Sequence, residues 1–147
     1  MSQPTALVTG GSGGIGSACV RELAGDHNVA IHYHTNREGA EAAAEAVEDS
    51  DTEALIVQAD LADRSDVERM VNHVTDKFGG IDVLVNNAAI FFQTSLLKMT
   101  PEQIETTLSV NMGGTIYCTR AVLASMLERG GKIITIASLA GTQGSPT

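Results

Sequence analysis

Residues 9–16 carry the clearest chemical signal, because five of these eight residues are glycine and the run joins an apolar stretch to a helical pattern. Glycines let a backbone turn tightly and approach a pyrophosphate closely, and a helix N-terminus offers unpaired N–H groups to the anion. The run satisfies G-x-G-x-x-G at Gly11, Gly13 and Gly16, and T-G-x-x-x-G-I-G at Gly10, Gly14 and Gly16. Its position between strand and helix favours dinucleotide binding over the alternative, a glycine-rich loop that serves packing alone.

Two further side chains have the chemistry to act on a bound substrate. Ser138 follows an apolar run, and a hydroxyl there can donate a hydrogen bond to a carbonyl oxygen on which charge develops. Asn111 lies inside a helical pattern, where an amide side chain competes with the backbone for hydrogen bonds. The structural alternatives are a serine that only starts a loop and an asparagine that only faces solvent.

These residues must be positioned by a chain in which short apolar runs alternate with longer helical patterns. Strands are predicted over residues 6–8, 29–33, 55–57, 83–85 and 133–137, and helices over 14–24, 38–48, 64–78 and 101–128. The strands are continuous apolar runs, which predicts that both faces of the sheet are covered. Five strands with four intervening helices predict an α/β Rossmann fold, a doubly wound parallel sheet with strand order 3-2-1-4-5.

The helix boundaries carry recognisable capping signals. Asp63 can cap the third helix and Gly79 can end it, while Thr100, Pro101 and Gln103 form a capping-box pattern before the fourth. Residues 141–147 are loop-like, so the fifth strand is expected to be an uncovered edge, which natural folds usually protect. We therefore expect residues 1–147 to be one dinucleotide-binding Rossmann domain, incomplete at its C-terminus and truncated after strand five.

The composition argues against several partners. The formal net charge is −9, which disfavours nucleic acid and anionic membrane surfaces. No apolar run approaches the roughly 20 residues of a membrane span, no signal peptide is visible, and no metal-ligand spacing occurs. Two separated cysteines, Cys19 and Cys118, are typical of unpaired thiols in a reducing compartment. We expect a cytoplasmic protein that binds no metal.

The motifs taken together resemble those of the short-chain dehydrogenase/reductase family, most closely the 3-oxoacyl thioester reductases and their relatives. The glycine-rich run comes first, and Asp60 and Leu61 follow the third strand. Residues 86–89, Asn-Asn-Ala-Ala, match the family's N-N-A-G except that Ala89 replaces the glycine. Asn111 in a Ser-Val-Asn context and Ser138 in Ile-Ala-Ser complete the series. The resemblance spans nearly the whole chain.

The resemblance implies an oxidoreductase that transfers hydride between NADP(H) and a carbonyl or secondary alcohol, with a 3-oxoacyl thioester as the candidate small-molecule substrate. It implies catalytic roles for Ser138 and Asn111, and a full-length parent that forms a homodimer or homotetramer. The cofactor-binding residues that it implies are Gly10, Ser12, Gly13, Gly14, Ile15, Gly16, Tyr33, His34, Thr35, Asn36, Arg37, Asp60, Leu61, Asn87, Ala88 and Ala89.

The cofactor preference is read at the end of the second strand. Enzymes that use NAD place an acid there for the ribose 2′-hydroxyl, and such an acid repels a 2′-phosphate. Here no acid appears before Glu38, and His34 and Arg37 can bind a phosphate. NADP(H) is therefore favoured. NAD(H) stays open, because Gly13 occupies a position at which many NADP-binding family members carry Arg or Lys.

One part of the family pattern is missing from this chain. Family members use a Tyr-x-x-x-Lys pair after the catalytic serine, whereas Tyr33 and Tyr117 are followed four positions later by Arg37 and Ala121. Loss of general acid catalysis costs about 10²–10⁴ in rate. We therefore expect the chain as given to be nearly inert alone. The alternative is a non-catalytic nucleotide-binding module.

Overall fold

Five parallel strands form a single sheet in the order β3-β2-β1-β4-β5. The computed structural model describes residues 3–48 and 51–144. The predicted fold class and strand order are confirmed. The strands are β1 (Thr5–Val8), β2 (Asn28–Tyr33), β3 (Ala54–Gln58), β4 (Val83–Asn86) and β5 (Lys132–Thr135).

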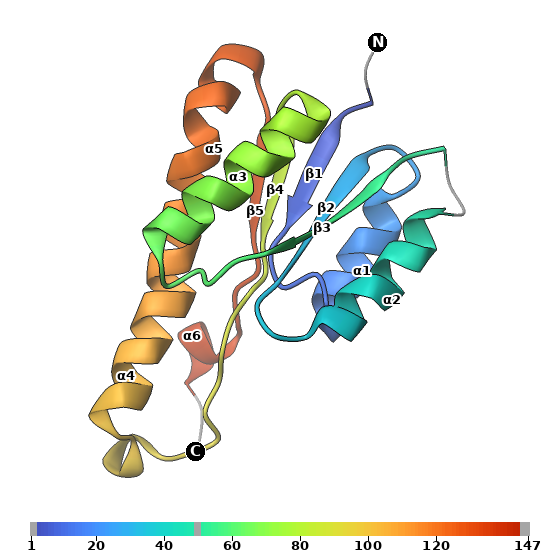
Figure 1. Ribbon diagram of the computed structural model, residues 1–147. Helices are drawn as coiled ribbons and strands as arrows, with labels where there is room; N and C mark the ends of the chain where they lie inside the picture. Colours follow the sequence, from blue (N-terminus) through green and yellow to red (C-terminus); the bar gives the residue numbers. More distant parts are fainter. Residues whose placement is uncertain (1–2, 49–50, 145–147) are drawn as a thin grey trace.

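Helices cover the two faces of this sheet, as Figure 1 shows. One face carries α1 (Gly14–Leu23) and α2 (Arg37–Glu48), and the other carries α3 (Arg64–Phe78) and α5 (Thr115–Arg129). The remaining helical segments are the 3₁₀ turn η1 (Leu96–Lys98), α4 (Pro101–Thr107), the π-helical segment η2 (Leu108–Gly114) and α6 (Ala140–Gln143).

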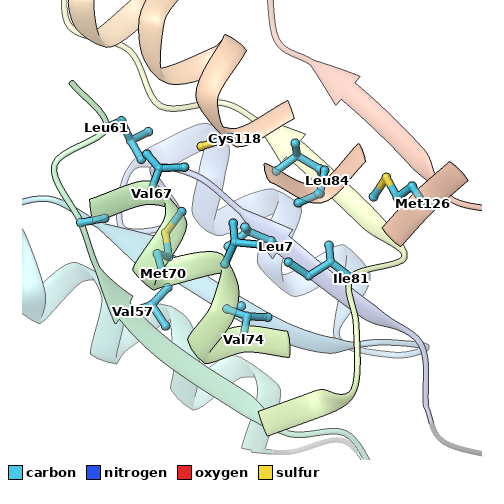
Figure 2. Packing of buried hydrophobic residues seen from close by; sticks show 14 residues of the cluster. Leu7, Val57, Leu61, Val67, Met70, Val74, Ile81, Leu84, Cys118 and Met126 are labelled. Atoms are coloured by element: carbon cyan, nitrogen blue, oxygen red, sulfur yellow. The ribbon is translucent and has the colours of Figure 1, made fainter. Parts of the chain in front are cut away.

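The core lies in two layers because successive residues of a strand point to opposite faces. On the α3/α5 side, Leu7 and Leu84 of the sheet pack against helical residues that include Val67, Met70 and Cys118 (Figure 2). On the α1/α2 side the partners are smaller. That layer consists mainly of Ala6, Val8, Val20, Val29, Ile31, Ala40, Ala43, Val47, Val83 and Val85.

Three buried polar residues continue the strand rows that face α3 and α5. Thr9 follows Leu7, His32 follows Ala30, and Asn86 follows Leu84, each two positions further along its strand. Their exposed fractions are 1%, 2% and 4%. Buried polar groups are usually hydrogen-bonded. The side chains of Thr9 and His32 are, whereas Asn86 donates to the Thr119 hydroxyl and its side-chain oxygen has no partner among the described residues. The change from apolar to polar therefore occurs at the carboxyl ends of the strands, directly beneath the loops that leave the sheet.

The predicted caps are present. Asp63 accepts hydrogen bonds from Ser65 N at 2.7 Å and Asp66 N at 3.4 Å, and bonds from Ser65 hold the pKa of the Asp63 carboxyl below its usual range. Thr100 and Gln103 form the reciprocal capping box. These bonds satisfy N–H groups that have no partner inside the helix, so α3 and α4 begin where the sequence predicts.

Several boundaries differ from prediction. The helix expected over residues 101–128 continues to Arg129 but is divided by η2, because its hydrogen bonds shift to a wider register around Asn111. The fifth strand covers Lys132–Thr135, not residues 133–137. The prediction of a loop over residues 141–147 is wrong for residues 141–143, which belong to the short helix α6, and residues 145–147 lie outside the described part.

The edge strand β5 is exposed along its whole length. Coverage of both faces was predicted for every strand; it holds for β1, β2 and β4, only in part for β3, and is wrong for β5. The prediction that the fifth strand is an uncovered edge of the sheet is confirmed. Ile133 and Ile134 are 38% and 45% exposed, and apolar residues of the neighbouring helical segments, including Met112 and Ile116, also face solvent. Among the described residues, no helix has the length and apolar character needed to cross a membrane.

Candidate functional site

A groove of about 550 Å³ opens at the carboxyl ends of the strands. It lies where β1 pairs with β2 on one side and β4 on the other, the point at which the strand order reverses. Ligands of open α/β sheets bind at such a point. The groove is lined by Gly10, Ser12, Gly13, Gly14, Ile15, Gly16, His32, His34, Asp60, Leu61, Asn87, Ala88, Ala89, Ile90 and Val110.

The glycine-rich loop presents the N-terminus of α1 to this groove. Gly13 is the N-cap residue, and no side chain caps the helix. Within the described residues, no hydrogen bond uses the N–H groups of Gly14, Ile15 or Gly16. Free N–H groups and the positive end of a helix dipole attract an anion. The loop can therefore hold a phosphate group, as its sequence predicts.

The glycines of the loop fall into two classes. A Cβ on Gly11 would lie 2.7 Å from Ile31 Cγ2, and a Cβ on Gly16 would overlap the Gly10 carbonyl oxygen, so packing alone requires these two. A Cβ on Gly14 would meet no atom within 4 Å, and one on Gly13 only the Gly10 oxygen at 3.6 Å. Packing does not explain Gly13 and Gly14. Their missing side chains leave space in the groove, which a closely approaching ligand requires.

The loop after β4 is attached to the glycine-rich loop through Thr9. Its hydroxyl donates to the Val85 carbonyl at 3.2 Å and accepts from Asn87 N at 3.0 Å and Ala88 N at 3.1 Å. The Asn87 side chain donates to the Thr9 and Gly10 carbonyls at 3.0 and 3.1 Å. These bonds give Asn87 a structural role and set Ala88 and Ala89 along the groove wall.

His32 links the glycine-rich loop to the wall of the groove that follows β3. The Gly10 N–H donates to its Nδ1 at 3.0 Å, and its Nε2 lies 3.1 Å from the Ala59 carbonyl oxygen. Because Nδ1 accepts, Nε2 must carry the proton and donate to Ala59. Burial lowers the pKa of His32 to about 4, so the imidazole is neutral near pH 7. The main-chain carbonyl of His32 also accepts from Gly11 N at 2.8 Å.

Asp60 and Leu61 form the wall that follows β3. Asp60 accepts from Ala62 N at 2.9 Å and its own N–H donates to Asp66 Oδ2 at 3.2 Å. That bond to the Asp60 N–H is the main reason that the pKa of Asp66 lies below its usual range. Leu61 is 5% exposed and packs against Gly114, where a Cβ would lie 2.8 Å from its side chain. The turn is therefore rigidly held beside the groove.

Of residues 33–37, which were predicted to bind the cofactor, only one lines the groove. His34 lines it, whereas Tyr33, Thr35, Asn36 and Arg37 do not. Asn36 donates to the Ser12 carbonyl at 3.2 Å, which links this segment to the glycine-rich loop. Arg37 Nε bonds Glu41 Oε1 at 2.7 Å, and Glu41 raises the pKa of Arg37. The roles of these four residues remain predictions.

A second pocket of about 560 Å³ adjoins the groove and shares Ile15 and residues 87–89 with it. Both predicted catalytic residues, Asn111 and Ser138, line this second pocket. The Ser138 hydroxyl oxygen accepts from Ala140 N at 3.2 Å, which leaves its proton available for another acceptor. The remaining lining is mostly apolar. It comprises Asn86, Met112, Thr115, Ile116, Thr135, Ile136 and Ala137.

The sequence did not single out His32, Ile90 or Val110 for the groove. A signal existed for His32 alone, because it is a polar residue inside an otherwise apolar strand run. Ile90 and Val110 carry no such mark, since apolar residues occur throughout the chain. Among the described residues, no three His, Cys, Asp or Glu side chains gather closely enough to hold a metal ion.

The fold and the groove define the class of protein. A parallel sheet in the order 3-2-1-4-5, a glycine-rich turn into α1 and a groove at the strand reversal are together the features of a Rossmann fold. The family model described as short chain dehydrogenase matches residues 4–147. The chain belongs to the short-chain dehydrogenase family.

Its relatives are longer proteins. A 3-oxoacyl-[acyl-carrier-protein] reductase of Staphylococcus epidermidis is 36% identical over 144 residues, which are 97% of this chain and 59% of the relative. A 3-oxoacyl-[acyl-carrier-protein] reductase of Synechocystis is 38% identical over 148 residues, 99% of this chain and 60% of the relative. A solved short chain dehydrogenase from Burkholderia cenocepacia, in complex with NADP, superposes with a TM-score of 0.90 at 38% identity, over 99% of this chain and 60% of that one. The chain thus spans about 60% of the length of these relatives.

Proposed function

We propose that this chain forms the NADP(H)-binding and substrate-facing part of an oxidoreductase that acts on a carbonyl or secondary alcohol. The observation that carries the proposal is the pair of adjoining pockets with a shared wall of Ile15 and residues 87–89. The glycine-rich loop in the first pocket would hold the dinucleotide, and the shared wall would lead toward the second pocket, which Ser138 and Asn111 line.

The residues present fit a dinucleotide. The unpaired N–H groups at the start of α1 suit the pyrophosphate, and the space beside Gly13 and Gly14 allows close approach. Asp60 and Leu61 suit the adenosine end, and Asn87 to Ala89 the ribose and nicotinamide side. When bound, the nicotinamide supplies or accepts the hydride. The chain's own contribution is to hold it against the second pocket.

The preference for NADP(H) is supported by the segment after β2. It carries no acid before Glu38, and it offers His34 in the groove and Arg37 three positions later in the sequence. The Burkholderia cenocepacia relative was solved with NADP, which agrees with this preference. A 2′-phosphate near residue 34 would compete with Glu41 for the Arg37 guanidinium, because Arg37 now bonds Glu41. NAD(H) remains the alternative cofactor.

Ser138 is proposed as the catalytic group that contacts the substrate. Its hydroxyl proton can be donated to a carbonyl oxygen in the second pocket and stabilise the charge that develops there. The apolar lining suits an acyl chain, and the reductase relatives in Staphylococcus epidermidis and Synechocystis are named for 3-oxoacyl substrates. The side-chain amide of Asn111 is hydrogen-bonded to the Ile90 backbone, so we propose that Asn111 shapes the pocket. A 3-oxoacyl thioester is the substrate class that we propose.

Neither tyrosine lines the second pocket among the described residues. Tyr33 packs into the α1/α2 layer and Tyr117 against the α3/α5 layer. We therefore expect the chain on its own to bind the cofactor but to turn over slowly. The part of each pocket that faces solvent leaves room for further structure in a longer protein.

The test is cofactor titration followed by turnover. NADPH should bind more tightly than NADH, and slow reduction of a 3-oxoacyl thioester should fall further in Ser138→Ala while NADPH affinity is unchanged. Ser65→Ala, on the exposed start of α3, is the matched control and should change neither. Equal affinities for the two cofactors would contradict the NADP preference. If NADPH binds tightly but Ser138→Ala does not change turnover, the result would favour a non-catalytic nucleotide-binding module.

We also propose that the protein self-associates and is cytoplasmic. The exposed apolar residues Leu123 and Leu127 of α5, which lie outside both pockets, support a subunit contact, since such patches mark interfaces. Free Cys19 and buried Cys118 are consistent with a reducing compartment. Sedimentation analysis should find a dimer or tetramer, and a stable monomer at assay concentration would contradict the first proposal.

A further inference from the structure

His32 is a buried ionisable side chain for which hydride transfer has no direct use. It is 2% exposed, and both ring nitrogens are engaged by the backbone of neighbouring segments, not by solvent. Its row on β2 faces α3 and α5, where Ala30 occupies the equivalent place two residues earlier. An apolar residue at position 32 would suit that row for packing alone, so the imidazole requires another explanation.

We propose that His32 is a positioning residue for the cofactor, whose imidazole holds the glycine-rich loop and the turn after β3 at the spacing that a dinucleotide needs. The proposal rests on the proposed function, because it takes the groove to be a dinucleotide site. His32 lines the groove at its base but acts through Gly10 and Ala59.

The first arm of the argument concerns Gly10. Its N–H donates to His32 and its carbonyl accepts from Asn87, so this one residue is held from β2 on one side and from the β4 loop on the other. Gly10 adopts φ +64°, and a Cβ there would lie 2.9 Å from Ala88 Cα. Gly10 therefore has little room to move, and removal of the His32 imidazole would break its side-chain contact to β2.

The second arm concerns Ala59, which directly precedes Asp60 in the wall after β3. His32 Nε2 donates to the Ala59 carbonyl at 3.1 Å, and the bond is buried. The imidazole thereby joins the wall that suits pyrophosphate to the wall that suits adenosine. A side chain without polar atoms at position 32 would leave the Gly10 N–H and the Ala59 carbonyl both unpaired, which is costly when they are buried.

The protonation state of the His32 imidazole decides whether it can form both hydrogen bonds. Nδ1 accepts only while the ring is neutral, and a second proton would face the Gly10 N–H donor. The charged or titratable groups nearest the ring are His34 and Asp60, which act in opposite directions, and burial outweighs both. The neutral ring with its proton on Nε2 is therefore the state that fits both bonds near pH 7.

Three substitutions separate the two bonds. His32→Asn keeps an acceptor near the place of Nδ1, His32→Gln keeps a donor near the place of Nε2, and His32→Leu keeps neither. We expect the NADPH dissociation constant to rise about 10-fold or more in His32→Leu, with smaller rises in the other two. Val29→Ala is the matched control, since Val29 is equally buried on β2 but faces the α1/α2 layer. It should lower the unfolding temperature without changing NADPH affinity.

The comparison removes simple destabilisation as an explanation. If Val29→Ala and His32→Leu lose similar stability but only the latter loses NADPH affinity, the positioning role stands. If all three His32 variants bind NADPH as the wild type does, the proposal is overturned. A wild type that fails to bind NADPH or NADH would contradict the proposed function instead, so the two failures are distinguishable.

A measurement on the wild type covers the case in which the variants do not fold. Nitrogen NMR of ¹⁵N-histidine-labelled protein identifies which ring nitrogen of His32 carries the proton. A neutral ring protonated at Nε2, with a Gly10 amide signal that shifts on NADPH binding, is the expected result. A ring protonated at Nδ1, or a Gly10 amide that exchanges as freely as an open loop, would overturn the proposal.

Discussion

Two hydrogen bonds join the side-chain amide of Asn111 to the backbone N–H and carbonyl of Ile90. The Asn111 oxygen accepts from Ile90 N at 2.8 Å, and its nitrogen donates to the Ile90 carbonyl at 2.9 Å. Asn111 lies in the π-helical segment η2. Such widened helical turns are often found at functional sites. The pair therefore attaches the loop after β4 to the helix beside the second pocket.

Asn111→Ala should destabilise the protein by about 1–3 kcal/mol, because it leaves both polar groups of Ile90 without a partner in a partly buried place. Urea denaturation measures this. Thr106→Ala is the control, since its exposed hydroxyl bonds only the Glu102 carbonyl within the same helix, and it should change stability by less than about 0.5 kcal/mol. Equal effects would mean that the Asn111 bonds contribute nothing.

Gly14→Ala and Gly16→Ala should have opposite effects on the protein without cofactor. A methyl group at Gly16 overlaps the Gly10 carbonyl, so Gly16→Ala should lose about 1–3 kcal/mol. A methyl group at Gly14 meets open space at the start of α1, so Gly14→Ala should gain up to about 1 kcal/mol. NADPH affinity should nevertheless fall in Gly14→Ala. Thermal unfolding with and without NADPH tests both, and a Gly14→Ala protein with unaltered affinity would remove Gly14 from the site.

Arg37→Ala should weaken NADPH binding several-fold and leave NADH binding unchanged, because only NADPH carries the 2′-phosphate. Glu41→Gln should strengthen NADPH binding, since it removes the carboxylate that now bonds the Arg37 guanidinium at 2.7 Å. Both effects should shrink as salt is added, because Arg37 is exposed. Titration of both cofactors at two salt concentrations is the measurement. A parallel loss for NADPH and NADH in Arg37→Ala would show that Arg37 does not recognise the phosphate.

The stability of the protein should fall with acid in a window that His32 defines. Its pKa is about 4 in the folded chain against an ordinary 6.5, so the unfolded chain binds a proton in that window and the folded chain does not. The contribution of His32 to the free energy of unfolding is therefore fully present above pH 6.5. It decreases by about 3 kcal/mol as the pH falls toward 4. Urea denaturation of wild type and His32→Asn at several pH values isolates this contribution, and identical pH profiles would contradict it.

The fold followed closely from the apolar pattern. Residues of β1, β2 and β4 form continuous apolar runs and are buried on both faces, and Asp63 and Thr100 cap their helices as their positions predict. These features are local, since a run of side chains or a cap depends on residues a few positions apart. The uncovered edge of β5 was also predicted, whereas the exposure of its faces was not, because that exposure depends on what lies beside the strand in space.

The same distinction explains the site. The glycine-rich loop was recognisable because its function depends on the spacing of nearby residues. The contact between Asn111 and Ile90 was not, since it joins residues 21 positions apart. His32 was overlooked for the same reason. Its partners Gly10 and Ala59 are brought to it by strand pairing, and nothing in residues 28–33 specifies them.

The hydroxyl of Thr9 has a consequence for the order in which the chain folds. During synthesis the glycine-rich loop emerges first, yet the Asn87 N–H that bonds Thr9 follows 78 residues later. A contact across so long a loop forms late. A nascent chain that ends before β4 therefore lacks one wall of the groove, and a nucleotide would meet the complete groove only after β4 has paired with β1.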